Sequence, residues 1–146
     1  MTGENYFLDI IFEEISIKTN GEGDMIDITD DLAKILNKSG MKKGLLTSFI
    51  PGSTAALTTI EYEPGLKSDF PSAMDRLIPK NIPYEHDLTW HDGNGHSHVK
   101  ASMIGPSLII PFKNGRLTLG TWQQVVLLEM DTHSRSRRIN IQMMGE

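Results

Sequence analysis

The sequence of 146 residues contains no cysteine, which excludes disulfide frameworks, thiolate metal sites and cysteine nucleophiles. Any metal bound by this chain must therefore take nitrogen and oxygen ligands. Basic residues are also scarce, since 14 lysines and arginines against 19 acidic residues give a net charge of -5. This balance argues against a nucleic-acid partner, which requires a positively charged surface.

Long hydrophobic runs are missing as well. The longest apolar stretches, such as residues 107–112, fall far short of the roughly 20 residues that cross a bilayer. The first residues lack the basic and apolar regions of a secretory signal. We therefore expect a cytoplasmic protein without a membrane partner. With 38% hydrophobic and 23% charged residues, the chain is expected to fold as one domain around its own core.

The spacing of hydrophobic residues predicts an α+β fold of mainly antiparallel sheets with two helices. The first helix is expected to be capped by Thr29 or Asp30 and to end at Gly40. The second begins within residues 64–69 and is stopped by Pro79.

Most of the remaining chain has the composition of β-strands. Asn114 and Gly115 form the pair that favours a type I′ hairpin turn between two of them. The predicted strands are residues 7–18, 44–50, 55–62, 96–104, 107–112, 116–119, 123–131 and 137–143.

Four of the five histidines lie between positions 86 and 98, a density that indicates a functional segment. Gly93 and Gly95 permit tight turns there. Because alternate side chains of a strand share a face, the predicted strand 96–104 would carry a polar face and a core face. The polar face would hold His96, His98, Lys100 and Ser102, and the core face Val99, Ala101 and Met103.

Three interpretations of this polar face remain open. The histidines can bind Zn²⁺, Mg²⁺ or a similar divalent ion together with a carboxylate. Alternatively, one histidine acts as a general acid–base without a metal while Lys100 binds an anionic substrate group. The third interpretation is a solvated polar face without a site. The candidate metal ligands are His86, His91, His96, His98, Glu61 and Asp92.

Other polar residues are candidates for weaker reasons. Glu129 lies among apolar neighbours and needs a partner, for which Arg138 is the expected choice in a structural ion pair. His133 is expected in an exposed turn. Hydroxyl and amide side chains near glycine turns suit phosphate binding. These candidate substrate-binding residues are Ser102, Ser107, Thr121 and Gln123.

Four ordered blocks of the sequence carry a family resemblance. They are PGSTAALTTIEYEP (51–64), NGHSHVKAS (94–102) followed by GPS (105–107), GRLTLGTWQ (115–123) and QMMGE (142–146). In these blocks the chain resembles the YjbQ family of secondary thiamine-phosphate synthases. The resemblance covers essentially the whole sequence.

The resemblance implies a single YjbQ-like α+β domain over residues 1–146 that assembles as a homotrimer, with the polar site at or near subunit contacts. It also implies a low thiamine-phosphate synthase activity, which joins a pyrimidine diphosphate to a thiazole phosphate and releases pyrophosphate. The primary role of the family is unsettled. The matching site candidates are His98, Lys100 and Ser102, followed by His86, Glu61 and Thr121.

The chain departs from the family at one position. Many relatives have a histidine where this sequence has Gly52. The role of that histidine is then lost or is taken over by His91 or His96, which leaves the ligand set open.

These observations lead to two hypotheses. The first is an enzyme that acts on a small phosphorylated or anionic substrate, in which His98 and His96 coordinate metal or move protons and Lys100 holds the anion. The alternative is a small-molecule or metal-binding module without catalysis. A cupin-like oxygenase fits less well, because positions 102 and 103 lack the glutamate that a cupin requires after its His-x-His pair.

Overall fold

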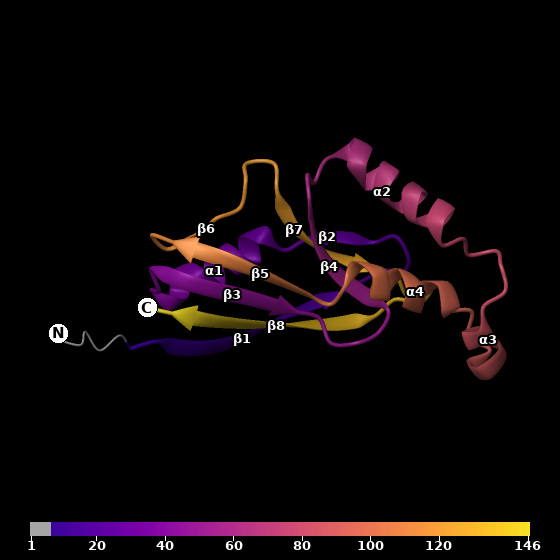
Figure 1. Ribbon diagram of the computed structural model, residues 1–146, viewed down its shortest axis with the longest axis horizontal. Helices are drawn as coiled ribbons and strands as arrows, with labels where there is room; N and C mark the ends of the chain where they lie inside the picture. The colour runs from indigo at the N-terminus through magenta and orange to yellow at the C-terminus, as the bar shows by residue number, and fades with distance from the viewer. Residues whose placement is uncertain (1–6) are drawn as a thin grey trace, which may run out of the picture.

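The computed structural model describes residues 7–146, and in this part of the chain eight strands form two antiparallel sheets that four helices accompany (Figure 1). The larger sheet has the strand order β1-β8-β3-β5-β6 and the smaller sheet the order β2-β7-β4. The elements are β1 (Asp9–Lys18), β2 (Met25–Asp27), α1 (Thr29–Ser39), β3 (Lys43–Phe49), β4 (Ala55–Ile60), α2 (Pro64–Leu77), α3 (Glu85–Trp90), α4 (Gly95–Ile104), β5 (Ser107–Lys113), β6 (Arg116–Leu117), β7 (Gln124–Glu129) and β8 (Ser136–Gly145).

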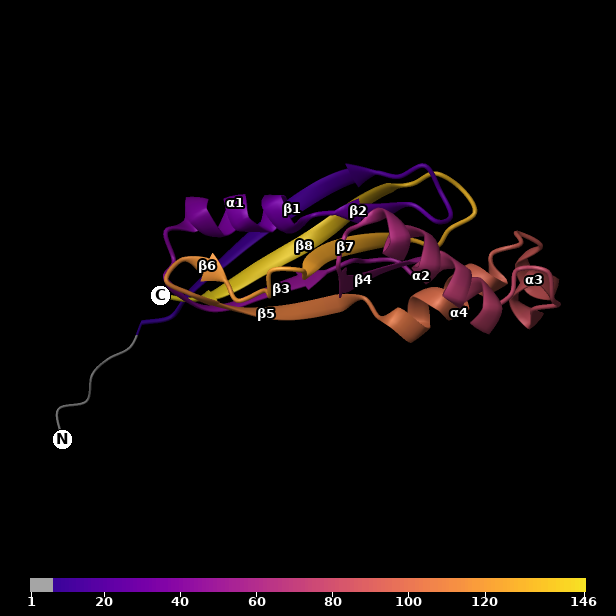
Figure 2. The ribbon, with the colours of Figure 1, turned by 90° about the horizontal axis from the view of Figure 1, so that it is seen from above.

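The main core lies between the larger sheet and a layer made of α1 and the smaller sheet (Figure 2). Buried aliphatic side chains fill it, and burial of each stabilises the fold by about 1.5–3 kcal/mol. They include Leu32 and Leu36 of α1, Leu46 of β3, Leu57 of β4, Leu127 of β7, and Ile139, Ile141 and Met143 of β8. A second apolar cluster lies on the other face of the smaller sheet, beneath α2 and α4.

Strand β7 is buried on both faces because it is the central strand of the smaller sheet. Val125 and Leu127 point into the main core, whereas Val126 and Leu128 point into the second cluster. This explains why its sequence is a continuous hydrophobic run instead of an alternating one.

The α+β class and the antiparallel pairing are confirmed, but residues 7–146 contain four helices and not two. Both additional helices, α3 and α4, come from the histidine-rich segment. The predicted strand 96–104 is wrong, because these residues are helical. The turn prediction agrees with the backbone, since Asn114 and Gly115 have φ of 54° and 71°, as a type I′ turn requires.

Capping of α1 also differs from the expectation. Neither Thr29 nor Asp30 caps this helix, whose cap position is Ile28 without a side-chain hydrogen bond. The Thr29 hydroxyl instead accepts a hydrogen bond from the Val125 backbone N–H at 2.9 Å. It therefore ties the start of α1 to β7. Gly40 ends the helix with φ of 74°, as expected.

Helices α2, α3 and α4 gather at one end of the molecule, and the C-terminus lies at the other end (Figures 1 and 2). Helices α3 and α4 and the loop between them carry most of the candidate residues. Among the helices of the described residues, none is long and apolar enough to cross a membrane.

Gly44 provides a test of the packing between β3 and β8. A Cβ atom at this position would press against the Met144 carbonyl oxygen and lie 2.8 Å from the Gly145 Cα. We expect Gly44→Ala to lower the free energy of unfolding by at least about 2 kcal/mol, as overpacking does. Urea unfolding at fixed protein concentration measures this. Thr47→Ala in the same strand should cost at most about 1 kcal/mol, and an equal loss in the two variants would contradict the packing argument.

Candidate functional site

The second half of the histidine-rich segment begins α4 (Gly95–Ile104), and the geometry of a helix places its polar side chains on different faces from those expected in a strand. Side chains four positions apart share a helix face. His96 and Lys100 therefore lie together on the buried side, where they are 1% and 4% exposed. His98 lies on another face with Ser102, whose hydroxyl donates to the His98 carbonyl oxygen at 2.8 Å.

The expectation that His96, His98 and Lys100 lie side by side is therefore wrong. It rested on strand alternation, and the helix separates His98 from the other two. The expected core face is wrong in part as well: Ala101 is buried, but Val99 and Met103 are 41% and 62% exposed. Strand propensity is low in this stretch, in which Val99 is the only β-branched residue before Ile104. Gly105, with φ of 101°, ends the helix.

His98 meets two other candidate ligands, His86 of α3 and Asp92 of the loop between α3 and α4. One ligand atom from each residue lies within 4.8 Å of the other two. The rings of His86 and His98 have centroids 4.3 Å apart. The His86 Nε2 atom lies 3.4 Å from the Asp92 carboxylate. This cluster of His86, Asp92 and His98 is half-exposed and is termed the histidine site below.

Close contact between α3 and α4 brings the two imidazoles together. A Cβ atom at Gly95 would press into Tyr84 and come within 2.8 Å of its Cγ, so only glycine permits this approach. The Asp87 carboxylate accepts a hydrogen bond from the Gly95 backbone N–H at 2.9 Å, which satisfies a free donor at the start of α4.

The loop from 91 to 94 holds Asp92 in place. His91 has φ of 52° and ends α3, and the Asn94 backbone N–H donates to the Asp92 carboxylate at 3.1 Å. That hydrogen bond is the main cause of a lowered pKa at Asp92; burial opposes it, and His86 adds to the lowering. Asp92 is therefore deprotonated at neutral pH, which is the form in which a carboxylate binds a metal ion.

The remaining candidate ligands lie outside the histidine site. His96 is turned away, and neither His91 nor Glu61 belongs to the group of converging ligand atoms. The residues 7–146 that the structure describes contain no other such group of three or more. Gly52, where many relatives have a histidine, lies beside Arg137, whose Nη1 would be 3.1 Å from a Cβ there.

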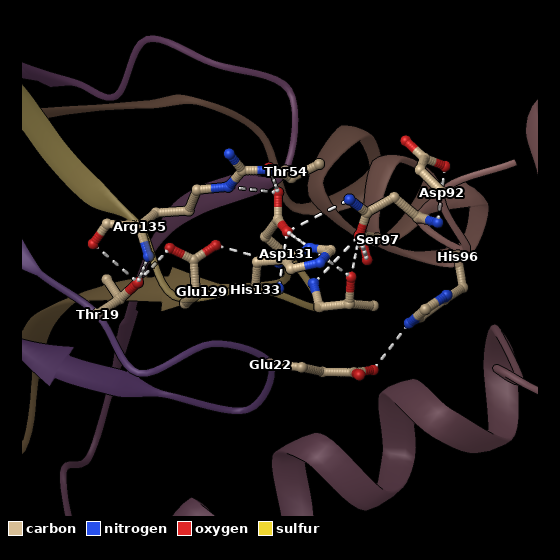
Figure 3. Close-up of polar contacts among 12 residues, drawn as sticks. Thr19, Glu22, Thr54, Asp92, His96, Ser97, Glu129, Asp131, His133 and Arg135 are labelled. Atoms are coloured by element: carbon tan, nitrogen blue, oxygen red, sulfur yellow. Dashed lines mark hydrogen bonds and ion pairs between the residues drawn. The ribbon is translucent and has the colours of Figure 1, made fainter. Parts of the chain in front are cut away.

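His96 and Lys100 belong to a second polar cluster that centres on Glu22, a residue of the β1–β2 loop. The Glu22 carboxylate lies 2.9 Å from the His96 Nε2 (Figure 3). It also lies 2.9 Å from the Lys80 Nζ and 3.9 Å from the Lys100 Nζ. Lys100 is also 2.5 Å from the Asp75 carboxylate of α2. Burial alone raises the pKa of Glu22, but hydrogen bonds from Lys80 and His96 outweigh it and lower the pKa below its usual range.

A buried ionic network lies beneath α4, at the junction of β7 and β8. Glu129 is 1% exposed and accepts two hydrogen bonds from the Arg137 guanidinium, at 2.8 and 2.6 Å. Its expected partner Arg138 instead points outward and lies 3.9 Å from Glu14. The prediction of a structural ion pair is thus confirmed with a different arginine.

Asp131 extends this network to the start of α4 (Figure 3). It accepts hydrogen bonds from Thr54, Arg135 and the Asn94 amide. Asn94 in turn accepts from the Ser97 hydroxyl at 3.0 Å. The network thereby fixes the loop that carries Asp92. His133, whose backbone N–H also donates to Asp131, has a side chain that is 68% exposed, as expected for a turn.

The other proposed substrate-binding residues are not gathered around α4. Ser107 is exposed at the start of β5. Thr121 and Gln123 line a shallow depression beside α1 and β6, which contains no residue of α4. The Gln123 amide donates to the Thr59 hydroxyl at 3.2 Å.

Several residues of these sites escaped sequence reasoning. Glu22 and Asp75 lie far from the histidine-rich segment in the chain, and nothing in their local sequence marks them. Asn94 and Asp131 carried a weak signal, since each is a polar residue at the boundary of a regular element.

Comparisons with a family model, with known sequences and with solved structures all indicate the same family. The family model described as "UPF0047 protein YjbQ-like" matches residues 13–146. The chain belongs to the YjbQ family. A UPF0047 protein of Methanothermobacter thermautotrophicus is 34% identical over 140 residues, 96% of each chain. The UPF0047 protein YugU of Bacillus subtilis is 36% identical over 137 residues, which cover 92% of this chain and all of the relative.

A solved structure shares the fold closely. A YbjQ-like protein of unknown function from Sulfolobus solfataricus superimposes with a TM-score of 0.90 at 31% identity, covering 96% of this chain and 100% of that one. The names of these YjbQ relatives state no activity.

Asp131 provides a pH test of the buried network. Burial alone raises the pKa of Asp131, but the His133 N–H, the Thr54 hydroxyl, Arg135 and Asn94 outweigh it and lower the pKa far below its usual range. A lowered folded-state pKa contributes stability that is present above the unfolded pKa of about 4 and is lost as pH falls below it. We expect Asp131→Asn to lower the free energy of unfolding by about 3 kcal/mol at neutral pH. The difference in this free energy between wild type and the variant should become smaller toward pH 3.

Urea unfolding at several pH values measures this difference. The exposed Asp69→Asn serves as the control and should follow the wild-type curve. A constant gap between wild type and Asp131→Asn from pH 7 to pH 3 would show that the carboxylate charge is not what holds the network.

Proposed function

We propose that this member of the YjbQ family is a cytoplasmic enzyme that acts on a small phosphorylated or otherwise anionic substrate through a divalent metal at the histidine site. One observation carries the proposal: a ligand atom from each of His86, Asp92 and His98 lies within 4.8 Å of the others. Two imidazoles favour zinc over magnesium. Three protein ligands leave a coordination position for water or substrate, as in catalytic zinc sites.

The chemistry of the site fits an anionic substrate. His86, Asp92 and His98 would hold a divalent ion, which would supply positive charge to phosphate oxygens and to a departing pyrophosphate. Lys100 was expected to hold the anion, but it lies on a different face of α4 from His98 and is paired with Asp75 of α2. We therefore assign the binding of the anion to the metal. A low thiamine-phosphate synthase activity, in which pyrophosphate leaves the pyrimidine diphosphate, is compatible with this assignment, and we propose it as a secondary activity.

Zinc titration tests the ligand set. We expect one zinc per chain by calorimetry and by elemental analysis of the loaded protein. His98→Ala and His86→Ala should each weaken zinc binding by more than about 100-fold, since loss of an outer-sphere partner alone costs about 10–100-fold. His91→Ala, which removes a neighbouring imidazole outside the site, should bind zinc as wild type does. The ligand set is wrong if the wild type binds no zinc, or if His91→Ala loses as much zinc affinity as His98→Ala and His86→Ala do.

Turnover tests the catalytic part of the proposal. Zinc-loaded wild type should join a pyrimidine diphosphate to a thiazole phosphate, and a chelator should abolish this until zinc is restored. His98→Ala should show background turnover and retain a wild-type circular dichroism spectrum. Unchanged turnover in His98→Ala would refute catalysis at this site, and zinc binding without turnover would favour a metal-binding module.

We also propose that the chain assembles as a homotrimer through the outer face of the larger sheet. The strand registers align Ile10, Met144, Leu45 and Pro111 in one row across four strands. All four are exposed and apolar. Phe12, Phe49 and Ile109 on the same face are 59%, 41% and 65% exposed. A contiguous apolar face of this kind supports a protein interface.

A charge in the centre of this row tests the interface. We expect Leu45→Asp to convert the trimer to monomers, because a buried carboxylate without a partner opposes association. Light scattering coupled to size-exclusion chromatography measures the mass. Lys34→Asp on the exposed side of α1 is the control and should remain trimeric. A wild-type monomer, or a trimeric Leu45→Asp, would contradict the proposal.

A further inference from the structure

A cavity of about 490 Å³ lies between α2 and the smaller sheet, within the range typical of small-molecule sites. Its walls are mainly apolar and include Met25, Phe70, Met74, Leu128 and Met130. The same cavity is lined by charged residues of the Glu22 cluster. It therefore combines an apolar wall with a charged group of residues, as sites for amphipathic ligands do.

The charges of this cavity are balanced in pairs. Lys100 is 2.5 Å from Asp75, and Lys80 is 2.9 Å from Glu22. The two remaining carboxylates of the lining already have partners. Glu129 is paired with Arg137, and Asp24 accepts a hydrogen bond from the Asn20 backbone N–H at 2.9 Å.

The two partners in the Lys100–Asp75 pair differ in their surroundings. The Lys100 side chain is only 5% exposed, whereas the Asp75 side chain is 62% exposed on α2. A buried ammonium must keep an anionic partner. The exposed Asp75 carboxylate can instead be solvated by water at little cost, so another anion can replace Asp75 as the partner of Lys100.

A ligand with a single charge would disturb this balance. A carboxylate alone on Lys100 would displace Asp75 and bring an additional negative charge next to Glu22, which is 3.9 Å from the Lys100 Nζ. An ammonium alone beside Asp75 would compete with Lys100 for its carboxylate. A zwitterion brings a carboxylate and an ammonium together. Its carboxylate can lie next to Lys100 and its ammonium next to Asp75, so that positive and negative charges alternate.

We propose that this cavity binds a zwitterionic α-amino acid with a hydrophobic side chain. The ligand carboxylate accepts from the Lys100 ammonium, and the ligand ammonium donates to Asp75. The hydrophobic side chain packs against Phe70 and the methionines, whose flexible thioethers adapt to aromatic and aliphatic shapes. This site is separate from the histidine site, because the cavity is lined by Lys100 and not by His98.

Three probes with the same ring and different charge test this proposal: L-phenylalanine, phenethylamine and 3-phenylpropionate. The readout is NMR of methionine methyl groups in the full-length protein. L-Phenylalanine should shift the Met25, Met74 and Met130 signals and leave Met41 and Met143 of the main core unchanged. The amine and the acid should each bind at least about 10-fold more weakly, because each lacks one charge-assisted hydrogen bond.

Asp75→Asn is the matching variant, since it keeps the shape of an exposed side chain and leaves Lys100 the Glu22 carboxylate at 3.9 Å as its anionic partner. It should weaken L-phenylalanine binding by at least about 10-fold, by the same loss of one charged partner, and should not weaken 3-phenylpropionate binding. Asp69→Asn removes the same charge from α2 outside the cavity and should leave all three affinities unchanged.

Three outcomes would overturn the assignment. The acid or the amine alone could bind as tightly as the amino acid, Asp75→Asn could leave L-phenylalanine binding unchanged, or no probe could shift the three cavity methyls at 10 mM, roughly the weak limit of small-ligand binding. None of these results depends on zinc, so they are independent of the tests of the histidine site.

Discussion

The pairing of Glu129 with Arg137 is the interaction on which the site end of the molecule depends. Both groups are buried, and removal of either partner would leave an uncompensated charge at a cost of about 3–5 kcal/mol. The pair fixes the end of β7 against the start of β8. Through Thr54 and Asp131 the same network reaches Asn94, which holds the Asp92 loop. Hydrogen bonds thus connect the packing of the two strands to the loop that carries Asp92.

Helix α4 divides the polar residues of the histidine-rich segment between two environments. Its buried face presents His96 and Lys100 to carboxylates from the β1–β2 loop and α2. His98, on another face, meets His86 and Asp92. One helix therefore contributes His98 to the half-exposed histidine site and His96 and Lys100 to the buried Glu22 cluster. This explains why residues that are neighbours in the sequence lie in different environments. It also means that substitutions within this helix must be interpreted by face and not by sequence distance.

Seven of the eight strands in the described part of the chain and the first two helices were predictable, because hydrophobic spacing and turn residues there agree with the structure. The three-residue strand β2 was not predicted, because it is too short to show a pattern. The segment 84–104 was not, since alternating polar and apolar residues fit both a strand and a helix over ten residues. Tertiary contacts decide between them: Gly95 packs on Tyr84, and Asp87 accepts from the Gly95 N–H. His86 and His98 were among the expected ligands, but their proximity depends on α3, which the sequence did not reveal. The partners Glu22 and Asp75 are brought in by long-range folding, which a local pattern does not encode.

Gly95 has a further consequence for how the family can vary. The distance between the two imidazoles is set by an amino acid that contributes no atoms of its own to the site. A Cβ atom at this position would press into Tyr84 at the start of α3, so the contact between the two helices would have to change. If the histidine site holds the proposed ion, a relative that keeps both histidines and the aspartate but carries a side chain at position 95 would bind that ion more weakly.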